Sequence, residues 1–178
     1  MNIFKRIKRF AMMHNLPVMV MGGASIMAHT RTTARLKELD ENGVYQYTEE
    51  RREIRNRVVT TEFVDFLVDQ MIAETSEFGD FKFHQCGLGV TAENITDSGI
   101  ETDTGISPVT GTQVETDHDT YKSVATMIMD ATEAITEHVV MSQSGAGTCI
   151  DRTKFGAINV VSGNQIEFTF EISFTAGG

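Results

Sequence analysis

The sequence predicts a mainly β fold with one or two helices, in which an antiparallel β-sandwich body is preceded by a helical, charged N-terminal arm. Three observations predict this class. The chain has no Trp, only 2 Pro and 15 Gly among 178 residues, together with many Thr, which favours strands and turns. Its last strand alternates apolar and polar residues over a long run. Its length allows one well-buried core.

Charge divides the chain near residue 60. Residues 1–60 hold 11 of the 15 Lys and Arg residues and 6 of the 25 Asp and Glu residues, a net charge of +5, and the remainder carries −15. We therefore expect a basic N-terminal arm and a charged connecting segment over 1–58, and a helix plus antiparallel sandwich over 59–178. A basic arm on an acidic body indicates a contact surface at the amino end and argues against nucleic-acid binding by the body. The alternative is a solvated charged face at each end.

The predicted arm is amphipathic. Its apolar side chains share one helical face, and four cations lie elsewhere. The expected partner-binding residues of the arm are Phe4, Lys5, Arg6, Ile7, Lys8, Arg9 and Phe10. Such an arm could dock into a partner's groove or lie on a membrane, and the acidic body disfavours the membrane. A signal peptide is a weaker interpretation, because Pro17 interrupts an apolar stretch that is too short to span a bilayer.

After the arm, a charge-rich segment is followed by a segment whose apolar residues have helical spacing. Residues 31–58 are dense in charges of both signs, so we expect a solvated surface or polar interface and no core role. From Thr60 the spacing predicts a helix at about 61–75, with Thr60 or Thr61 as N-cap and Glu62 in the first turn. The helix has an apolar stripe that needs a sheet to cover it: Phe63, Phe66, Leu67 and Met71.

Strand patterns occupy the rest of the chain. In residues 81–86, Phe81 and Phe83 are expected on one face, with His84 and Cys86 on the other. Residues 91–120 have the polar composition of a long loop. Strands follow at 121–129, where both faces are expected to be covered, and at 135–141, where one face is expected to carry Ile135, Val139 and Met141.

The closing residues predict a hairpin in which 157–161 pair with 165–175 across a turn at 162–164. Its second strand places five large apolar side chains on one face, which implies an opposing layer. With the helix stripe, the expected core residues are Phe63, Phe66, Leu67, Phe155, Ile166, Phe168, Phe170, Ile172 and Phe174.

The sequence contains no pattern typical of catalysis, so we expect a non-enzymatic protein with no catalytic, cofactor-binding or metal-binding residues. The five histidines never fall at i and i+4 or beside a cysteine pair. The acidic runs 97–103 and 115–119 could collect Ca²⁺, but neither follows the twelve-residue calcium loop, so solvated loops are predicted. Cys86 and Cys149 are far apart in sequence and are predicted to be buried and reduced.

Several short motifs occur in order over roughly the C-terminal hundred residues. They are Phe81-Lys-Phe-His84, Thr91-Ala-Glu93, Ala134-Ile-Thr-Glu-His138, Gly145-Ala-Gly-Thr148, Asp151-Arg-Thr-Lys-Phe155, Ala157-Ile-Asn-Val-Val161, Ser162-Gly163 and the closing alternation 168–178. Together they resemble a family of tailed-bacteriophage virion proteins, and the N-terminal 58 residues do not match that family. From the residues alone, Asp151 and Arg152 could pair or cap a turn, and Phe155 would lie between the layers.

The resemblance implies a structural component of the virion, assembled in the host cytoplasm. We expect most specifically a capsid decoration (cement) protein that clamps neighbouring capsid subunits. Its expected partners are the major capsid protein or other virion proteins, and copies of itself in a cyclic oligomer, with a trimer favoured. One alternative is a neck, tail or fibre-anchoring virion protein. Another is a carbohydrate-binding sandwich using the loops at 91–120 and 142–149, which the lack of Trp weakens.

Overall fold

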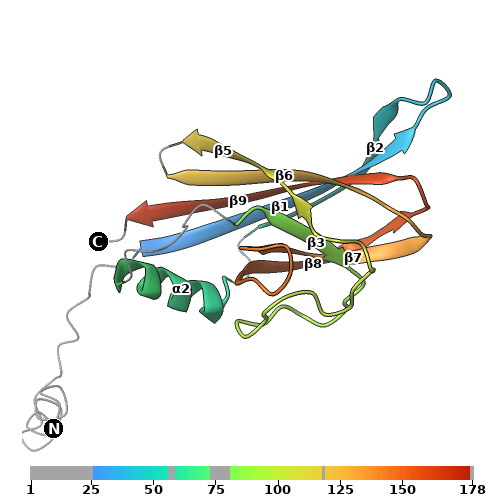
Figure 1. Ribbon diagram of the computed structural model, residues 1–178. Coiled ribbons are helices and arrows are strands. Elements are labelled where there is room, and N and C mark those ends of the chain that lie inside the picture. The colour runs from blue at the N-terminus through green and yellow to red at the C-terminus, as the bar shows by residue number, and fades with distance from the viewer. Residues whose placement is uncertain (1–25, 56–58, 73–80, 118, 177–178) are drawn as a thin grey trace, which may run out of the picture.

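The described part of the chain is a β-sandwich. The computed structural model describes residues 26–55, 59–72, 81–117 and 119–176, which form two antiparallel sheets and one helix (Figure 1). The predicted mainly β, antiparallel sandwich is confirmed. The helical arm expected at the amino end lies outside the described residues and stays a prediction.

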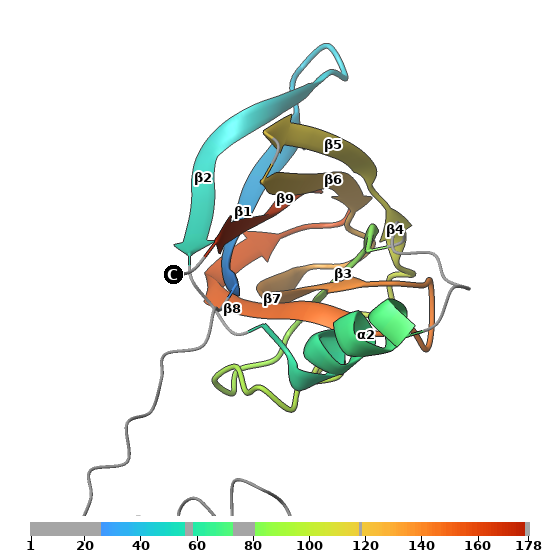
Figure 2. The same cartoon turned by 90° about the vertical axis from the view of Figure 1, so that its left-hand side faces the viewer.

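The two sheets form separate layers, as Figure 2 shows. The larger sheet has the order β2-β1-β9-β6-β5. Its strands are β1 (Ile26–Leu39), β2 (Tyr45–Arg55), β5 (Thr112–Asp117), β6 (Thr120–Ile128) and β9 (Gln165–Ala176). The smaller sheet has the order β4-β3-β7-β8 and is made of β3 (Phe83–Gly87), β4 (Val109–Thr110), β7 (Glu133–Met141) and β8 (Cys149–Val160). The helix, α2 (Thr61–Ile72), packs beside β8.

Strand β9 lies at the centre of the core, because it pairs with β1 on one side and β6 on the other. Its alternation directs Ile166, Phe168, Phe170 and Ile172 into the sandwich, and each is at most 1% exposed. Phe155 on β8 belongs to the same buried cluster as Phe168. The core therefore depends on large apolar side chains from the inner face of one central strand.

Helix α2 closes one end of the sandwich. Phe63 is buried in a second cluster with Phe170. The other expected core residues of this region pack against that cluster while only partly buried: Phe66, Leu67 and Phe174. The backbone N–H of Phe63 donates to Oγ1 of Thr60 at 3.2 Å, so Thr60 is the N-cap. The predicted helix is confirmed over Thr61–Ile72; the side chain of Met71 lies outside the described part.

The expectation that residues 31–58 have no core role is wrong. Residues 26–37 pair with β9, and the inner face of β1 carries Thr30, Thr32, Ala34 and Leu36, all buried. The cations of β1 point to the outer face. Because the inner face is mostly Thr and Ala, the sequence of β1 lacks the alternation of large apolar and polar residues that identifies a strand. The sandwich therefore begins well before the expected boundary at residue 58.

The expected hairpin at 157–175 is also wrong. Strand β8 pairs with β7 and strand β9 pairs with β1 and β6, so the turn between them crosses from one sheet to the other. Gly163 has the positive φ, +90°, that the turn requires. Its N–H donates to Met129 O, and Tyr45 Oη donates to Gly163 O, each at 2.8 Å. Turn chemistry alone does not distinguish this arch from a hairpin.

One strand follows the expected alternation in part and another departs from it. In β3, Phe83 lies on the face opposite His84 and Cys86, as expected, and packs on the outer face of the smaller sheet. Phe81, expected on the same face as Phe83, lies before β3 and packs in the second cluster with Phe63 instead. In β7, Ile135 belongs to the main core, while Val139 and Met141 pack with Phe83 on that outer face. The reason in β7 is a shift of register against β8 between Ile135 and Glu137, which reverses the alternation.

Two further strand regions differ in part from the prediction. The expected loop over 91–120 is shorter, because β4 and β5 lie within it. In β6, the inner face is buried, including Ala125 and Met127, but the other face is only partly covered and Ile128 is 58% exposed.

The central position of β9 predicts the effect of truncating one of its two fully buried Phe rings. We expect Phe170→Ala to reduce the free energy of unfolding by about 3–5 kcal/mol, since it removes apolar burial and leaves a cavity. Urea denaturation measures this loss. The neighbouring change Thr169→Ala, on the opposite face of β9, should cost less than about 1 kcal/mol. Equal losses for the two variants would contradict the assignment of the inner face.

Candidate functional site

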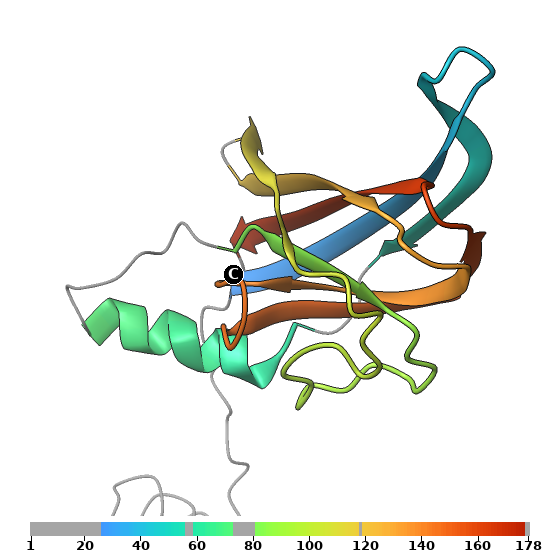
Figure 3. The same cartoon turned by 45° about the vertical axis from the view of Figure 1, so that its right-hand side comes forward.

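The candidate site is the segment 88–106, which makes up most of the connection from β3 to β4 (88–108) and lies across the outer face of the smaller sheet (Figure 3). It has no strand or helix of its own, so its shape must come from side-chain contacts with the sheet. Ile100 packs on the apolar residues Val139, Met141 and Cys149. Leu88 and Ile106 pack against the main core, and charged residues supply several of the remaining contacts.

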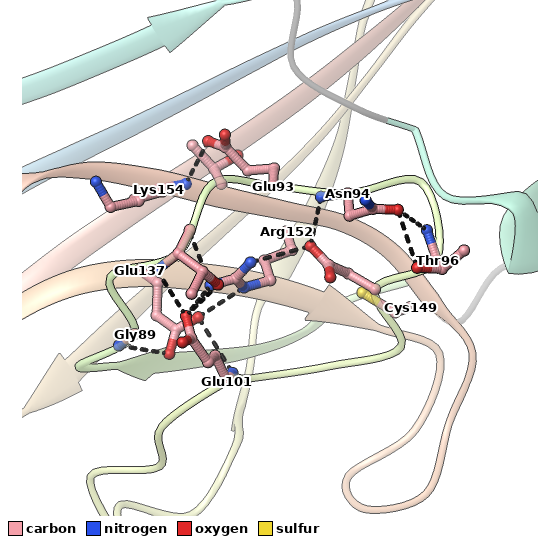
Figure 4. Close-up of polar contacts among 12 residues, drawn as sticks. Gly89, Glu93, Asn94, Thr96, Glu101, Glu137, Cys149, Arg152 and Lys154 are labelled. Atoms are coloured by element: carbon pink, nitrogen blue, oxygen red, sulfur yellow. Dashed lines mark hydrogen bonds and ion pairs between the residues drawn. The ribbon is translucent and has the colours of Figure 1, made fainter.

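Arg152 of β8 organises this segment (Figure 4). The side chain is 3% exposed, and its guanidinium meets three carboxylates. Nε donates to Glu137 Oε2 at 2.7 Å, Nη1 to Asp97 Oδ2 at 3.0 Å and Nη2 to Glu101 Oε2 at 2.7 Å. One buried cation therefore holds two points of the segment against the sheet.

Glu137 of β7 is the second centre of the network. The residue is fully buried, and its carboxylate accepts hydrogen bonds from the segment as well as from Arg152. Oε1 accepts the backbone N–H groups of Gly89 at 2.8 Å and Thr102 at 2.9 Å, and Oε2 accepts that of Glu101 at 3.2 Å. Paired and hydrogen-bonded in this way, the buried charge avoids the large cost of an isolated one.

The close approach of the backbone to Glu137 requires two glycines. A Cβ at Gly87 would lie 2.5 Å from Glu137 Oε1, and one at Gly89 would lie 2.4 Å from the same atom. No side chain fits at either position without displacing the carboxylate. Gly87 and Gly89, which do not form a phosphate-binding loop, thus serve the packing of this segment.

The segment also positions the helix. Thr61 donates its backbone N–H and its Oγ1–H to the carbonyl of Ile95, at 2.9 and 2.6 Å. Thr60 Oγ1 donates to the carbonyl of Cys149, and the Cys149 N–H donates to Glu62 Oε2 at 2.9 Å. The start of α2 is therefore fixed both to the segment and to the first residue of β8.

A separate polar cluster lies between the sheets. His84 Nδ1 is 2.9 Å from His138 Nε2, and His84 Nε2 is 2.8 Å from Ser123 Oγ. The ring of His138 stacks on Phe168, with centroids 4.3 Å apart. Burial lowers the pKa of His84 to about 4 and that of His138 well below its usual value, so both imidazoles are neutral at pH 7.

Asp151 belongs to the same interior. Its Oδ2 accepts a hydrogen bond from Thr153 Oγ1, which lies 3.2 Å from Thr32 Oγ1 of β1, and its Oδ1 has no hydrogen-bond partner among the described residues. Burial raises the pKa of Asp151 to about 7. Asp151 and Arg152, which could have paired with each other or capped a turn, do neither, because both lie within β8 and adjacent strand residues point to opposite faces.

The remaining residues that could bind a metal ion do not form a site within the described ranges. Cys86 and Cys149 are buried and free, as predicted, and burial raises the pKa of both thiols, that of Cys86 to about 12. Within the described ranges, no group of three or more His, Cys, Asp or Glu side chains could hold a metal ion. Asp97 and Glu101, from the acidic run considered for Ca²⁺, contact Arg152 instead. No helix in the described part is long and apolar enough to cross a membrane.

The network joins residues that are far apart in the sequence. Glu137, Arg152 and Thr91 come from three of the motifs that carry the resemblance, and Glu93 accepts the backbone N–H of Lys154 at 2.7 Å. Sequence reasoning missed the Glu137–Arg152 pair. The signal in the sequence was the presence of two opposite charges, Glu137 and Arg152, each within a run of residues otherwise typical of a strand. The expected partner-binding residues of the arm, 4–10, lie outside the described residues.

Comparison with known proteins adds no relative: no family model, curated protein or solved structure matches this chain.

Removing the central cation should loosen the segment. We expect Arg152→Ala to reduce the free energy of unfolding by about 3–5 kcal/mol, because Glu137 stays buried without its counter-charge. Amide hydrogen exchange should also become faster across 88–104. The control is Lys154→Ala, which removes a cation from the same strand but keeps the backbone contact with Glu93. Unchanged exchange in the Arg152 variant would contradict the anchoring role.

The raised pKa of Asp151 predicts a pH-dependent effect of Asp151→Asn. The folded protein holds the proton up to about pH 7, whereas the unfolded chain releases it near 3.8, so this group's contribution to stability is lost as pH rises through that window. Relative to the parent protein, the variant should therefore gain about 2–3 kcal/mol between pH 5 and pH 8. Urea denaturation of both proteins at the two pH values measures the difference. The histidines are common to both proteins, and a pH-independent difference would show that Asp151 titrates normally.

Proposed function

We propose that the protein is a non-enzymatic virion structural protein, and most specifically a capsid decoration protein that clamps neighbouring capsid subunits. One observation carries the proposal. Three motifs that resemble the tailed-phage virion family, 91–93, 134–138 and 151–155, supply residues that fix segment 88–106 to the sheet. The residues that carry the resemblance therefore belong to one connected group of hydrogen bonds and ion pairs, although they are far apart in the sequence.

The architecture supports a structural role. A decoration protein stabilises a shell by adding contact area across the joints between subunits, and this requires a rigid body with projecting contact segments. Here the body is a sandwich whose longest connecting segment is fixed by a buried ion network. The β1–β2 hairpin projects past the rest of the sheet (Figure 1). The arm at 1–25 would supply a further contact with the capsid.

The titratable groups support a non-enzymatic role. His84, His138 and Asp151, whose pKa values are all strongly shifted by burial, are fully buried between the sheets, where a substrate does not reach them. Their hydrogen bonds connect β3, β6, β7, β8 and β1. They act as polar links within the core rather than as an accessible acid and base.

Two alternatives have different support. A neck, tail or fibre-anchoring protein would use the same rigid body, and the copy number in purified particles separates it from decoration. A number comparable to that of the capsid subunits favours decoration, and a number that fits a single ring favours the neck or tail. A carbohydrate-binding module is less favoured, because segments 88–108 and 142–148 contain no aromatic residue on which a sugar could stack.

Attachment to particles tests the proposal directly. A chain lacking residues 1–25 keeps all of β1, whereas removal of 1–30 would delete residues that pair with β9. We expect the shorter deletion to leave the melting temperature unchanged and to reduce binding to empty phage heads, because it removes the predicted docking residues. Binding of the full-length chain should raise the temperature at which the heads open. Heads that bind neither chain would refute decoration, and full occupancy by the truncated chain would refute the role of the arm.

A further inference from the structure

The outer face of the larger sheet carries an excess of positive charge on an acidic protein. Along 31–37 of β1 and the residues that pair with them, five cations face three carboxylates. The cations are Arg31, Arg35, Lys37, Arg51 and Arg55, and the carboxylates are Glu53, Glu167 and Glu171. The whole chain has a net charge of −10, so this face has the opposite sign to the protein that carries it.

Like charges oppose each other directly on this face. Arg35 pairs across the strands with Arg51, and Arg31 pairs with Arg55. Such pairs destabilise a sheet unless anions lie between them. Glu53 forms ion pairs with both Arg51 and Arg55. The guanidinium of Arg35 lies 3.7 Å from the centre of the Tyr47 ring and has no ion pair among the described residues. The face is therefore short of carboxylates.

The shortage coincides with a hollow in the surface. A shallow groove of about 380 Å³ is lined by Arg31, Arg35 and Arg51, by two threonines, and by Glu167 and Glu171. Arg51 is well exposed, with 56% of its side chain accessible. An acidic segment lying in this groove would separate the opposed arginines and receive hydrogen bonds from their guanidinium groups.

The same chain presents an acidic projection of suitable form. The turn between β1 and β2 extends beyond the neighbouring strands (Figure 1), and it exposes Glu38 and Glu41 beside two apolar side chains, Leu39 and Val44, each 53% exposed. Asp40 holds the turn in one shape, since its Oδ1 accepts the N–H groups of Asn42 and Val44, each at 2.9 Å. A preformed projection loses little conformational entropy on binding.

We propose that the acidic β1–β2 tip, residues 38–44, docks into the Arg31–Arg35–Arg51 groove of a second copy of this chain. Charge complementarity selects this occupant, and each chain supplies one tip and one groove, as a closed ring of identical subunits requires. The inference gives a contact to the cyclic oligomer expected from the sequence, and because it concerns the free protein it does not depend on the proposed attachment to a capsid. The two can therefore fail separately.

Charge reversal tests the docking. One variant reverses the charge of the groove and of the cation beside it with Arg51→Glu and Arg55→Glu. Each new carboxylate lies opposite an arginine of β1, an arrangement that favours the sheet. The second reverses the tip with Glu38→Lys and Glu41→Lys. The third carries all four changes, so its net charge equals that of the parent protein and its tip and groove are again complementary.

Sedimentation of each purified full-length protein over a range of concentrations measures self-association. We expect an oligomer for the parent chain, association weakened by about tenfold or more in each two-residue variant, and recovery in the four-residue variant. Circular dichroism should show that all four proteins are folded. The proposal is overturned if the parent is monomeric at every concentration, if either reversal leaves association unchanged, or if the combined variant does not recover. A monomeric parent whose binding to heads is weakened by both reversals would assign the groove and tip to the capsid instead.

Discussion

The buried contact between Arg152 and Glu137 is the interaction on which the surface of this protein depends. It places one positive and one negative charge under the segment 88–106, where the carboxylate meets three backbone N–H groups besides the guanidinium. That segment in turn provides the carbonyl that receives Thr61, and so positions the start of α2. A pair of charges within the smaller sheet thus determines both a long connection and a helix that are not part of either sheet.

A buried ion pair of this kind adds little net stability, because the cost of removing both charges from water offsets most of their attraction. Apolar residues of similar volume would fill the space at lower desolvation cost, but they could not recognise the backbone N–H groups of Gly89, Glu101 and Thr102. The pair selects one path of the segment among many. For a protein proposed to work through its surface, a single fixed path has greater value than a few additional kcal/mol.

The sequence predicted those elements whose burial pattern is local and strongly apolar. Strand β9 alternates large apolar residues with polar ones, and Thr60 begins a helical stripe, so both were visible in short windows. Strand β1 was not, because its inner face uses Thr30, Thr32 and Ala34 while its outer face carries cations. The Glu137–Arg152 pair was missed for a different reason, since strand pairing and a register shift bring the two together, and neither can be read from one strand alone.

The arch between β8 and β9 has a consequence for the order of events during synthesis. A C-terminal hairpin could have formed as a local unit, but β9 finds its partners in β6 and in β1, where Ile26 lies opposite Ala176. Pairing over such sequence separations is slow, because a long loop must close before any contact forms. Until residues 165–176 leave the ribosome, the nascent chain holds β1 and β6 without the strand that joins them. During that interval their edges and inner faces are open to chaperones, and to other copies emerging from the same message.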